Sequence, residues 1–395
     1  MSAAQKAVSA SKGRAPPQAS PFLQGHCGSD LIPKAKLHKN ATIAAQFMIK
    51  NAVILIVFTL CITMHSKGAG AYAPPPGGLR PLNLELDGHW IGNGVAFSPY
   101  RHGQSPDGVQ PSEAQILSDL KLVSHYWHLI RLYEVSPVAE STLALIDREH
   151  LPLRVILGAW INPGRTPAER GANRAQIDGA IRLARRYRGI VIAINVGNEA
   201  CVDWSDHRVT PAFLIRCIRE VRGAVTQPVT TADDFNFWNK PESRPVAAQC
   251  DFVMLHMYAL WNGQPLSRAM AWTGSIYDQI SAFHAGRPVI IGETGWATCR
   301  DATRTGPGQE STLMKAETSV GAQEEYLRQH YAWVRKHRVP TLLFEAFDEA
   351  WKGGGAATSP DVAEKHWGVF DEQRRPKASF RAIIREFYPT GADAR

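Results

Sequence analysis

The chain of 395 residues lacks the features that mark several classes of protein. It has no His, Cys or carboxylate spacing of the kind that holds zinc or calcium. The glycine-containing segment Ile91–Phe97 lacks the third glycine of a dinucleotide-binding fingerprint and runs on into a strand. No cysteine and histidine stand together as in a cysteine protease. We therefore expect no metal and no cofactor.

Excess positive charge is absent from most of the chain. Residues 1–73 contain eight Lys or Arg and one Asp, so the totals of 44 basic and 36 acidic residues leave 36 and 35 for the remainder. The basic sequence pI of about 9.2 thus originates in the N-terminal segment. A folded domain that binds nucleic acid needs a basic patch, and we expect no nucleic-acid partner.

An apolar run of about 20 residues, the length of a membrane span, is also missing. Residues 51–64 form a shorter apolar stretch that follows Lys50 and precedes two A-x-A sites ending at Ala71 and Ala73, as in a signal peptide. A membrane anchor is the alternative, if residues 43–49 join the span. We expect export to the periplasm or the extracellular space, with anchoring to the inner membrane left open.

These patterns divide the chain into four segments. Residues 1–47 are polar and lack periodic apolar positions, which predicts a disordered basic leader. Residues 48–73 are the signal peptide or membrane anchor. Residues 74–88 are rich in Pro and Gly and predict a linker. Residues 89–390 form the folded domain.

Eight β-rich runs alternate with helical stretches such as 112–125 and 168–187. This alternation predicts parallel βαβ units, and eight of them in about 300 residues favour one (β/α)8 TIM barrel, an α/β fold with a single domain. An open doubly wound sheet is the second interpretation. The expected strands are His89–Pro99, His128–Tyr133, Leu153–Trp160, Ile190–Asn195, Pro228–Ala232, Phe252–His256, Pro288–Gly292 and Thr341–Phe347.

Two glutamates end two of these runs. Glu199 closes the apolar segment 189–199, and Glu293 closes the segment 288–293. Apolar runs of this kind are typical of parallel strands buried on both faces, and barrel active sites lie at the C-terminal ends of such strands. Two carboxylates at one end of a barrel supply what glycoside hydrolysis requires.

Eight short motifs in barrel order resemble glycoside hydrolase family 17, the β-1,3-glucanases and related glucanosyltransferases, in the form found in bacterial and fungal members. They span residues 89–388, nearly the whole predicted domain. The motifs are Gly94–Arg101, Ile130–Tyr133, Val196–Glu199, Val229–Asp233, Val253–Tyr258, Gly292–Trp296, Phe344–Lys352 and Glu364–Phe370.

The resemblance assigns roles by position. It implies that Glu199 is the general acid/base and that Glu293 is the nucleophile of a retaining mechanism. Asn198, directly before the acid, is placed to bond the sugar 2-hydroxyl. Tyr133 and Tyr258 end their strands, where each phenol is expected to donate to the nucleophile.

The resemblance also implies contributions from the turn after the last strand. Glu349 is expected to bond sugar hydroxyls and Lys352 to act on the nucleophile; a salt bridge between these two residues is the alternative. Trp296 and Trp351 are expected to stack on sugar rings. His256 is expected to be a hydrogen-bonded strand-end residue and not a metal ligand.

Four cysteines lie beyond the predicted leader. Cys201 and Cys299 follow the two glutamates, so a disulfide between them is conceivable in an oxidising compartment. Cys217 and Cys250 are expected to be buried thiols.

Three functions stay open. The first is a retaining, endo-acting β-1,3-glucanase, and the second is a β-1,3-glucanosyltransferase with the same covalent intermediate. The third is a non-catalytic glucan-binding barrel, which the intact pair of glutamates opposes. In each case the partner is a β-glucan polysaccharide or oligosaccharide, and a monomer is expected.

Overall fold

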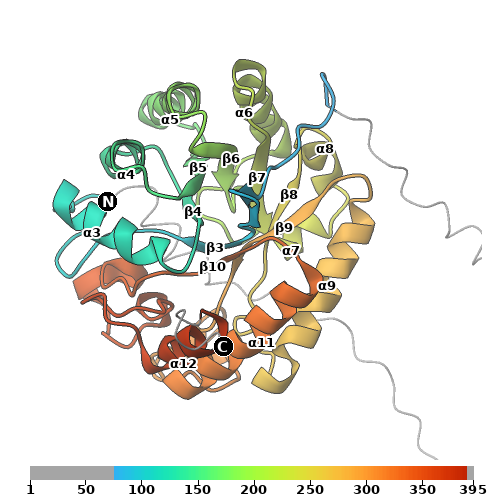
Figure 1. Cartoon of the computed structure of the whole chain (residues 1–395). Helices are drawn as coiled ribbons and strands as arrows, with labels where there is room; N and C mark the ends of the chain where they lie inside the picture. The colour runs from blue at the N-terminus through green and yellow to red at the C-terminus, as the bar shows by residue number, and fades with distance from the viewer. Residues whose placement is uncertain (1–74, 389–395) are drawn as a thin grey trace, which may run out of the picture. The chain divides into compact units, whose positions relative to one another are not determined.

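The computed structural model describes residues 75–388, and within them eight parallel strands close into a barrel. Each strand pairs with its neighbour in chain order, and β10 returns to β3 (Figure 1). The predicted (β/α)8 TIM barrel is confirmed. The barrel strands are β3 (Asn93–Ala96), β4 (Leu129–Leu132), β5 (Arg154–Ala159), β6 (Val191–Asn198), β7 (Val229–Asp234), β8 (Val253–His256), β9 (Val289–Thr294) and β10 (Thr341–Leu343).

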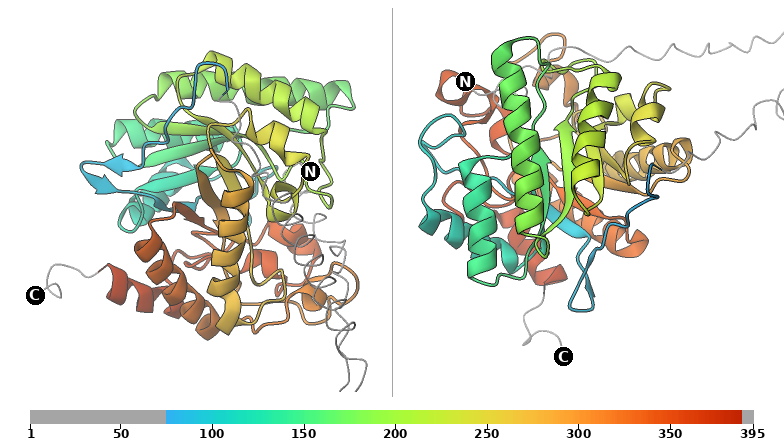
Figure 2. Two further views of the ribbon diagram at one scale, coloured as in Figure 1. Left: turned by 90° about the vertical axis from the view of Figure 1, so that its right-hand side faces the viewer. Right: turned by 90° about the horizontal axis from the view of Figure 1, so that it is seen from above.

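Helices surround the barrel (Figures 1 and 2). Three of them begin at a Ser-Pro or Thr-Pro pair, in which the hydroxyl caps the helix and proline occupies the first turn; the caps are Ser136, Thr166 and Thr210. The longer helices are α3 (Glu113–Ser124), α4 (Pro137–Arg148), α5 (Pro167–Arg186), α6 (Pro211–Ala224), α9 (Ala269–Phe283), α11 (Val320–His337) and α12 (Ala378–Phe387). The short ones are α7 (Phe235–Trp238), α8 (Ser243–Ala247), α10 (Glu310–Leu313), η1 (Leu266–Arg268), η2 (Lys352–Ala357) and η3 (Ala363–Lys365).

The first and last predicted strands differ from the observed ones. The run predicted at 89–99 breaks at Gly92, and its first part joins an antiparallel hairpin of β1 (Glu85–Leu86) and β2 (His89–Trp90). Strand β10 ends at Leu343, before the predicted end at Phe347. The other six strands lie close to where they were expected, so Glu199 directly follows the fourth barrel strand and Glu293 is the second-last residue of the seventh.

Described residues of the segment 74–88, predicted as a linker, contact the barrel. Arg222 donates to the carbonyls of Pro76 and Gly78, and the amide of Arg80 donates to Asp251 at 2.8 Å. Asp251 also pairs with Arg222 at 2.9 Å, with both side chains buried. These contacts hold the segment against the N-terminal ends of the barrel strands.

Apolar side chains of the same segment cover the end of the barrel interior. Leu82, Leu84 and Leu86 pack against a buried cluster that gathers side chains from most of the barrel strands. The leucines alternate with polar residues, as in an extended segment with one buried face. The cluster consists of Ile91, Leu129, Ile156, Ala193, Ala232, Phe252, Met254, Ile290 and Leu342.

The cysteines and the helices of residues 75–388 bear on two further expectations. Cys201, Cys217, Cys250 and Cys299 are all free thiols, so the conceivable disulfide between Cys201 and Cys299 is not formed. None of the helices in this range has the length and apolarity of a membrane span. The predicted leader and signal segment, residues 1–73, lie outside the described residues.

Candidate active site

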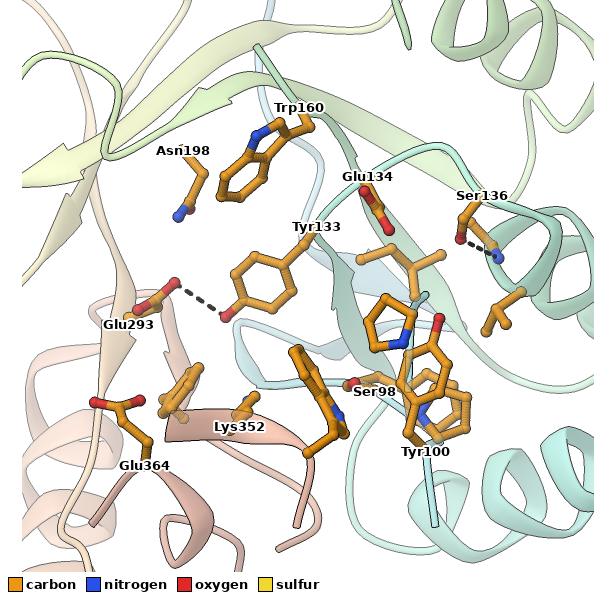
Figure 3. Close-up of a pocket in the computed structure, with 18 of the residues that line it drawn as sticks. Ser98, Tyr100, Tyr133, Glu134, Ser136, Trp160, Asn198, Glu293, Lys352 and Glu364 are labelled. Atoms are coloured by element: carbon orange, nitrogen blue, oxygen red, sulfur yellow. Dashed lines mark hydrogen bonds between the residues drawn. The ribbon is translucent and has the colours of Figure 1, made fainter. Parts of the chain in front are cut away.

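A cleft opens at the C-terminal ends of the barrel strands, and both predicted glutamates line it. Figure 3 shows Glu293 in this cleft. The side chain of Glu199 is 17% exposed and that of Glu293 is 7% exposed. Of the other predicted site residues, Asn198, Tyr133, Tyr258, Trp351 and Lys352 also line the cleft. Side chains that are distant in sequence thus meet at the end of the barrel where active sites of this fold lie.

The backbone turns sharply where β6 delivers Glu199. The register between β6 and β7 shifts between Asn195 and Asn198, and Gly197 has a φ of 82°. Glu199 itself has a φ of 46°, an uncommon conformation for a residue other than glycine. Its amide donates to the carbonyl of Ala232 at 2.8 Å. The turn directs the Glu199 side chain into the cleft and away from the barrel core.

Three donors converge on Glu293. Tyr133 donates to Oε1 at 3.0 Å, Tyr258 donates to Oε2 at 2.6 Å, and Arg131 donates to Oε1 at 3.0 Å. Burial and the Glu293 carboxylate raise the pKa values of both phenols well above the ordinary value, so the two hydroxyls keep their protons and donate. Acceptance at both oxygens holds the carboxylate in one orientation, as a nucleophile requires.

Arg131 was missed as a site residue. It is completely buried in β4, where its guanidinium contacts Glu293, the carbonyl of Gly292, and the amide oxygen of Asn198. With that oxygen accepting from Arg131, the amide nitrogen of Asn198 is directed elsewhere, and Asn198 lines the cleft. The geometry is consistent with the predicted bond from Asn198 to a sugar hydroxyl.

His256 lies between the two glutamates. Its Nε2 is 2.9 Å from Nη1 of Arg131, and because a guanidinium only donates, Nε2 is an acceptor. The proton of the neutral imidazole is therefore on Nδ1, which donates to Oε1 of Glu199 at 3.1 Å. The prediction of a hydrogen-bonded strand-end histidine is confirmed, and the ring fixes the carboxyl group of Glu199.

Among residues 75–388, Glu199, His256 and Glu293 are the one group whose ligand atoms are close enough together for a metal ion; these atoms lie within 4.8 Å of one another. The buried guanidinium of Arg131 already contacts both His256 and Glu293. Arg131 thus supplies the positive charge next to Glu293 that a metal ion would otherwise supply. We interpret the cluster as a carboxylate pair with its positioning residues.

Lys352 contacts other carboxylates than the predicted one. Its ammonium pairs with Glu345 and, at 2.6 Å, with Glu349, and all three side chains are buried. Burial raises the pKa of Glu345 well above its usual value, and the ammonium only partly offsets this; the two carboxylates outweigh burial and keep Lys352 protonated. Lys352 therefore pairs with these two carboxylates and not with Glu293 as predicted. The alternative, a salt bridge between Lys352 and Glu349, is confirmed, although the bridge is buried and not at the surface.

Two predicted contacts with sugar are corrected. Glu349 is completely buried and accepts from Ser98 and from Nε1 of Trp351 at 2.8 Å, so it positions Trp351 from below the cleft surface. Trp296 is 1% exposed, stacks on Tyr326 and donates to the carbonyl of Glu317. It is a core residue, because its ring packs on Tyr326 of α11 and does not line the cleft.

A histidine that lines the cleft, His207, was missed. His207 donates from Nε2 to the carbonyl of Asn198 at 2.7 Å and accepts from Ser205 at Nδ1. Its ring lies 4.5 Å from that of Trp160, a tryptophan that also lines the cleft. Burial lowers the pKa of His207, which favours the neutral ring. No strand or motif in the sequence singles out this loop residue.

The chain is similar to known glycoside hydrolases in sequence and in fold. The sequence profile of the BtgE/BtgC glycoside hydrolase domain matches residues 94–368. The chain is 26% identical over 326 residues to a probable glucan endo-1,3-beta-glucosidase, btgC, of Aspergillus clavatus; the match covers 77% of this chain but 44% of that protein. It is 24% identical to a glucan 1,3-beta-glucosidase of Arthroderma benhamiae, with 69% and 86% of the two chains covered.

Solved structures show the same fold. An endo-laminarinase from Formosa Hel1_33_131 has a TM-score of 0.64 and 22% identity, over 76% of this chain and 89% of that one. A β-1,3-glucanosyltransferase of glycoside hydrolase family 17 from Rhizomucor miehei has a TM-score of 0.55 and 22% identity, over 72% and 95%. Since the family profile covers more than half of its residues, the chain belongs to the BtgE/BtgC glycoside hydrolase domain family.

Proposed function

We propose that this protein is a retaining glycoside hydrolase of family 17 that cleaves β-1,3-glucan at internal bonds. The observation that carries the proposal is the separation of the two carboxyl groups. Oxygens of Glu199 and Glu293 lie within 4.8 Å of each other. Retaining enzymes have their carboxyl groups roughly 5–5.5 Å apart, whereas inverting enzymes need roughly 6.5–9.5 Å to admit a water.

The environments of the two glutamates support different roles. Glu293 accepts from Arg131, Tyr133 and Tyr258, which holds its carboxylate in the fixed orientation that a nucleophile requires. It attacks the anomeric carbon and forms a glycosyl ester, while Glu199 gives its proton to the departing glycosidic oxygen. Glu199 then takes a proton from the incoming water, the ester bond breaks, and Glu293 is regenerated.

A β-1,3-glucanosyltransferase is the second candidate. The same ester intermediate is transferred to a sugar hydroxyl when an acceptor sugar is bound and water is excluded. Two tryptophans that line the cleft, Trp160 and Trp351, favour this candidate, because flat aromatic surfaces suit a bound sugar. The names of the glucan-active relatives, a glucanosyltransferase among them, are consistent with both candidates.

One digestion series separates the two candidates. Laminaripentaose is incubated with the protein over a range of concentrations, and the products are resolved by chromatography. A hydrolase gives shorter products at every concentration, while a transferase gives products longer than five units whose share grows with concentration. Release of no product at all, from a folded sample, would overturn both candidates and leave the glucan-binding barrel.

Export of the protein is part of the proposal. It is supported by the signal-like residues 48–73 and by the polymeric substrate proposed here. The N-terminal sequence of the protein recovered outside the cytoplasm provides the test. A start near residue 74 supports cleavage, and an intact N-terminus in a membrane fraction supports the anchor.

A further inference from the structure

Glu134 is a carboxylate of the cleft that the proposed reaction does not use. It follows Tyr133 directly, at the end of β4, and lines the same cleft as the glutamate pair. Figure 3 shows its side chain entering the cleft between Trp160 and Ser136, on the other side of Tyr133 from Glu293. Glu134 therefore lies further along the cleft, with the ring of Tyr133 between it and Glu293.

No basic group of residues 75–388 forms an ion pair with Glu134, and no hydrogen bond reaches its carboxyl from within this range. Burial raises the pKa of Glu134 to about 7, and the neighbouring Asp107 adds to the effect. The phenol of Tyr100 is close enough to respond to the charge of Glu134. Lys352, the one Lys or Arg among the described residues that line the cleft, is engaged by Glu345 and Glu349.

Glu134 is only partly exposed. A partly buried carboxyl costs free energy unless water or a ligand satisfies it. Sugar hydroxyls are neutral donors, and a carboxyl offers two oxygens that accept from them. A hydrogen bond to a charged acceptor is about twice as strong as one between neutral groups. A negatively charged substituent at the same place would instead be repelled by Glu134 and Asp107 together.

We propose that Glu134 is a specificity-determining residue, which binds hydroxyls of a neutral glucosyl unit that lies further along the cleft than the two units joined by the cleaved bond, and which excludes a unit that carries negative charge. The inference rests on the proposed function, since it concerns the same cleft and substrate.

The first test is a series of chain lengths. Rates are measured with laminaribiose to laminarihexaose for the wild type and for Glu134→Ala and Glu134→Gln. With Glu134→Ala we expect kcat/KM for the hexaose to fall about tenfold, mainly through KM, and the rate on the shortest cleaved oligosaccharide to change less than about twofold. The control is Glu140→Gln, further along the chain in α4, where the side chain is 46% exposed and pairs with Arg182.

The second test addresses charge. A laminari-oligosaccharide with one terminal unit oxidised to a uronic acid is compared with its neutral parent at about pH 7.5, where a carboxyl of ordinary pKa is ionised. The wild type is expected to prefer the neutral sugar by about tenfold more than Glu134→Gln does. Thermal melting of each variant shows that it is folded, and Glu134→Gln keeps the side-chain shape if the alanine variant does not fold.

Two results would overturn the inference. One is a chain-length profile in Glu134→Gln and Glu134→Ala that equals that of the wild type. The other is an equal loss at every length, which indicates an effect on the fold or on the reaction itself. Failure of the wild type to cleave any of these oligosaccharides would overturn the proposed function instead, so the two failures are distinguishable.

Discussion

Arg131 and Glu293 form a buried ion pair, with Nη1 of the guanidinium 3.0 Å from Oε1 of the carboxylate. The two residues come from β4 and β9, which are separated by several strands around the barrel, and their side chains meet across its mouth. Because removal of one partner from a buried pair leaves the other charge uncompensated, the pair is sensitive to substitution at either position.

The first prediction concerns Arg131→Lys. A lysine keeps the charge but has a single donor centre, so it cannot hold Glu293, His256 and Asn198 together. We expect kcat on laminari-oligosaccharides to fall about 100-fold, with a smaller change in KM. Steady-state kinetics provide the measurement. Arg101→Lys is the control, since Arg101 pairs with Asp119, outside the reacting centre. If Arg131→Lys is as active as the wild type, the several donors of the guanidinium are not required.

The second prediction concerns Glu293→Ala. Without the nucleophile, glucan cleavage should fall by at least about 10⁴-fold while the barrel remains folded. Added azide should restore turnover, because it enters the space left by the side chain and attacks the anomeric carbon directly. The product is then a glycosyl azide of inverted configuration, identified by NMR. Activity near that of the wild type without azide contradicts the assigned role.

The third prediction concerns stability and pH at Glu134. Its folded pKa of about 7 lies above the ordinary value of 4.5, so its contribution to stability is fully present below pH 4.5 and is lost as pH rises through 7. Glu134→Gln, neutral at every pH, should match the wild type at about pH 4.5 and exceed it by about 2 kcal/mol at about pH 8. Thermal melts at both pH values test this; a constant difference contradicts it.

The charged groups that act on Glu134 are known from the structure. Asp107 raises its pKa, and the Tyr100 phenol responds to the same charge while it remains protonated through this range. Glu140→Gln again serves as the control, because that carboxylate is exposed and should show no such pH-dependent gain.

The fourth prediction concerns the opposite end of the barrel. Asp251→Asn removes the carboxylate that pairs with buried Arg222 and accepts from the amides of Arg80 and Val229. The free energy of unfolding should fall by about 3 kcal/mol. At room temperature kcat should be unchanged, because the cleft is at the other end. Denaturant unfolding and kinetics check the two parts, with Asp278→Asn, at an exposed position of α9, as the control.

The main part of the site could be predicted because strand ends are visible in a sequence. Glu199 and Glu293 each end a run of β-formers, and parallel strands bring their C-terminal ends to one place. Tyr133 and Tyr258 followed from the same argument, and both phenols contact the predicted nucleophile.

The remaining errors have physical causes. Arg131 stands inside the apolar run of β4. A charged residue in a run that is expected to be buried requires a partner, and this requirement was the signal that could have assigned Arg131 to the site. Trp296 and Glu349 lie in turns after their strands. The sequence pattern does not show in which direction such a turn points a side chain, so their burial could not be predicted. Residues 75–88 have the composition of a linker, but three alternating leucines, from Leu82 to Leu86, gave them an apolar face.

The clamp of Arg222 on the carbonyls of Pro76 and Gly78 also has a practical consequence. The polypeptide enters the domain beside the N-terminal ends of the barrel strands, at the end remote from the cleft. A tag, a surface linkage or a fused protein attached before Pro75 therefore starts from the rear of the enzyme. Immobilised in this way, the domain turns the open end of its cleft away from the support. This orientation matters for an insoluble polymer, whereas a soluble oligosaccharide reaches the cleft in any orientation.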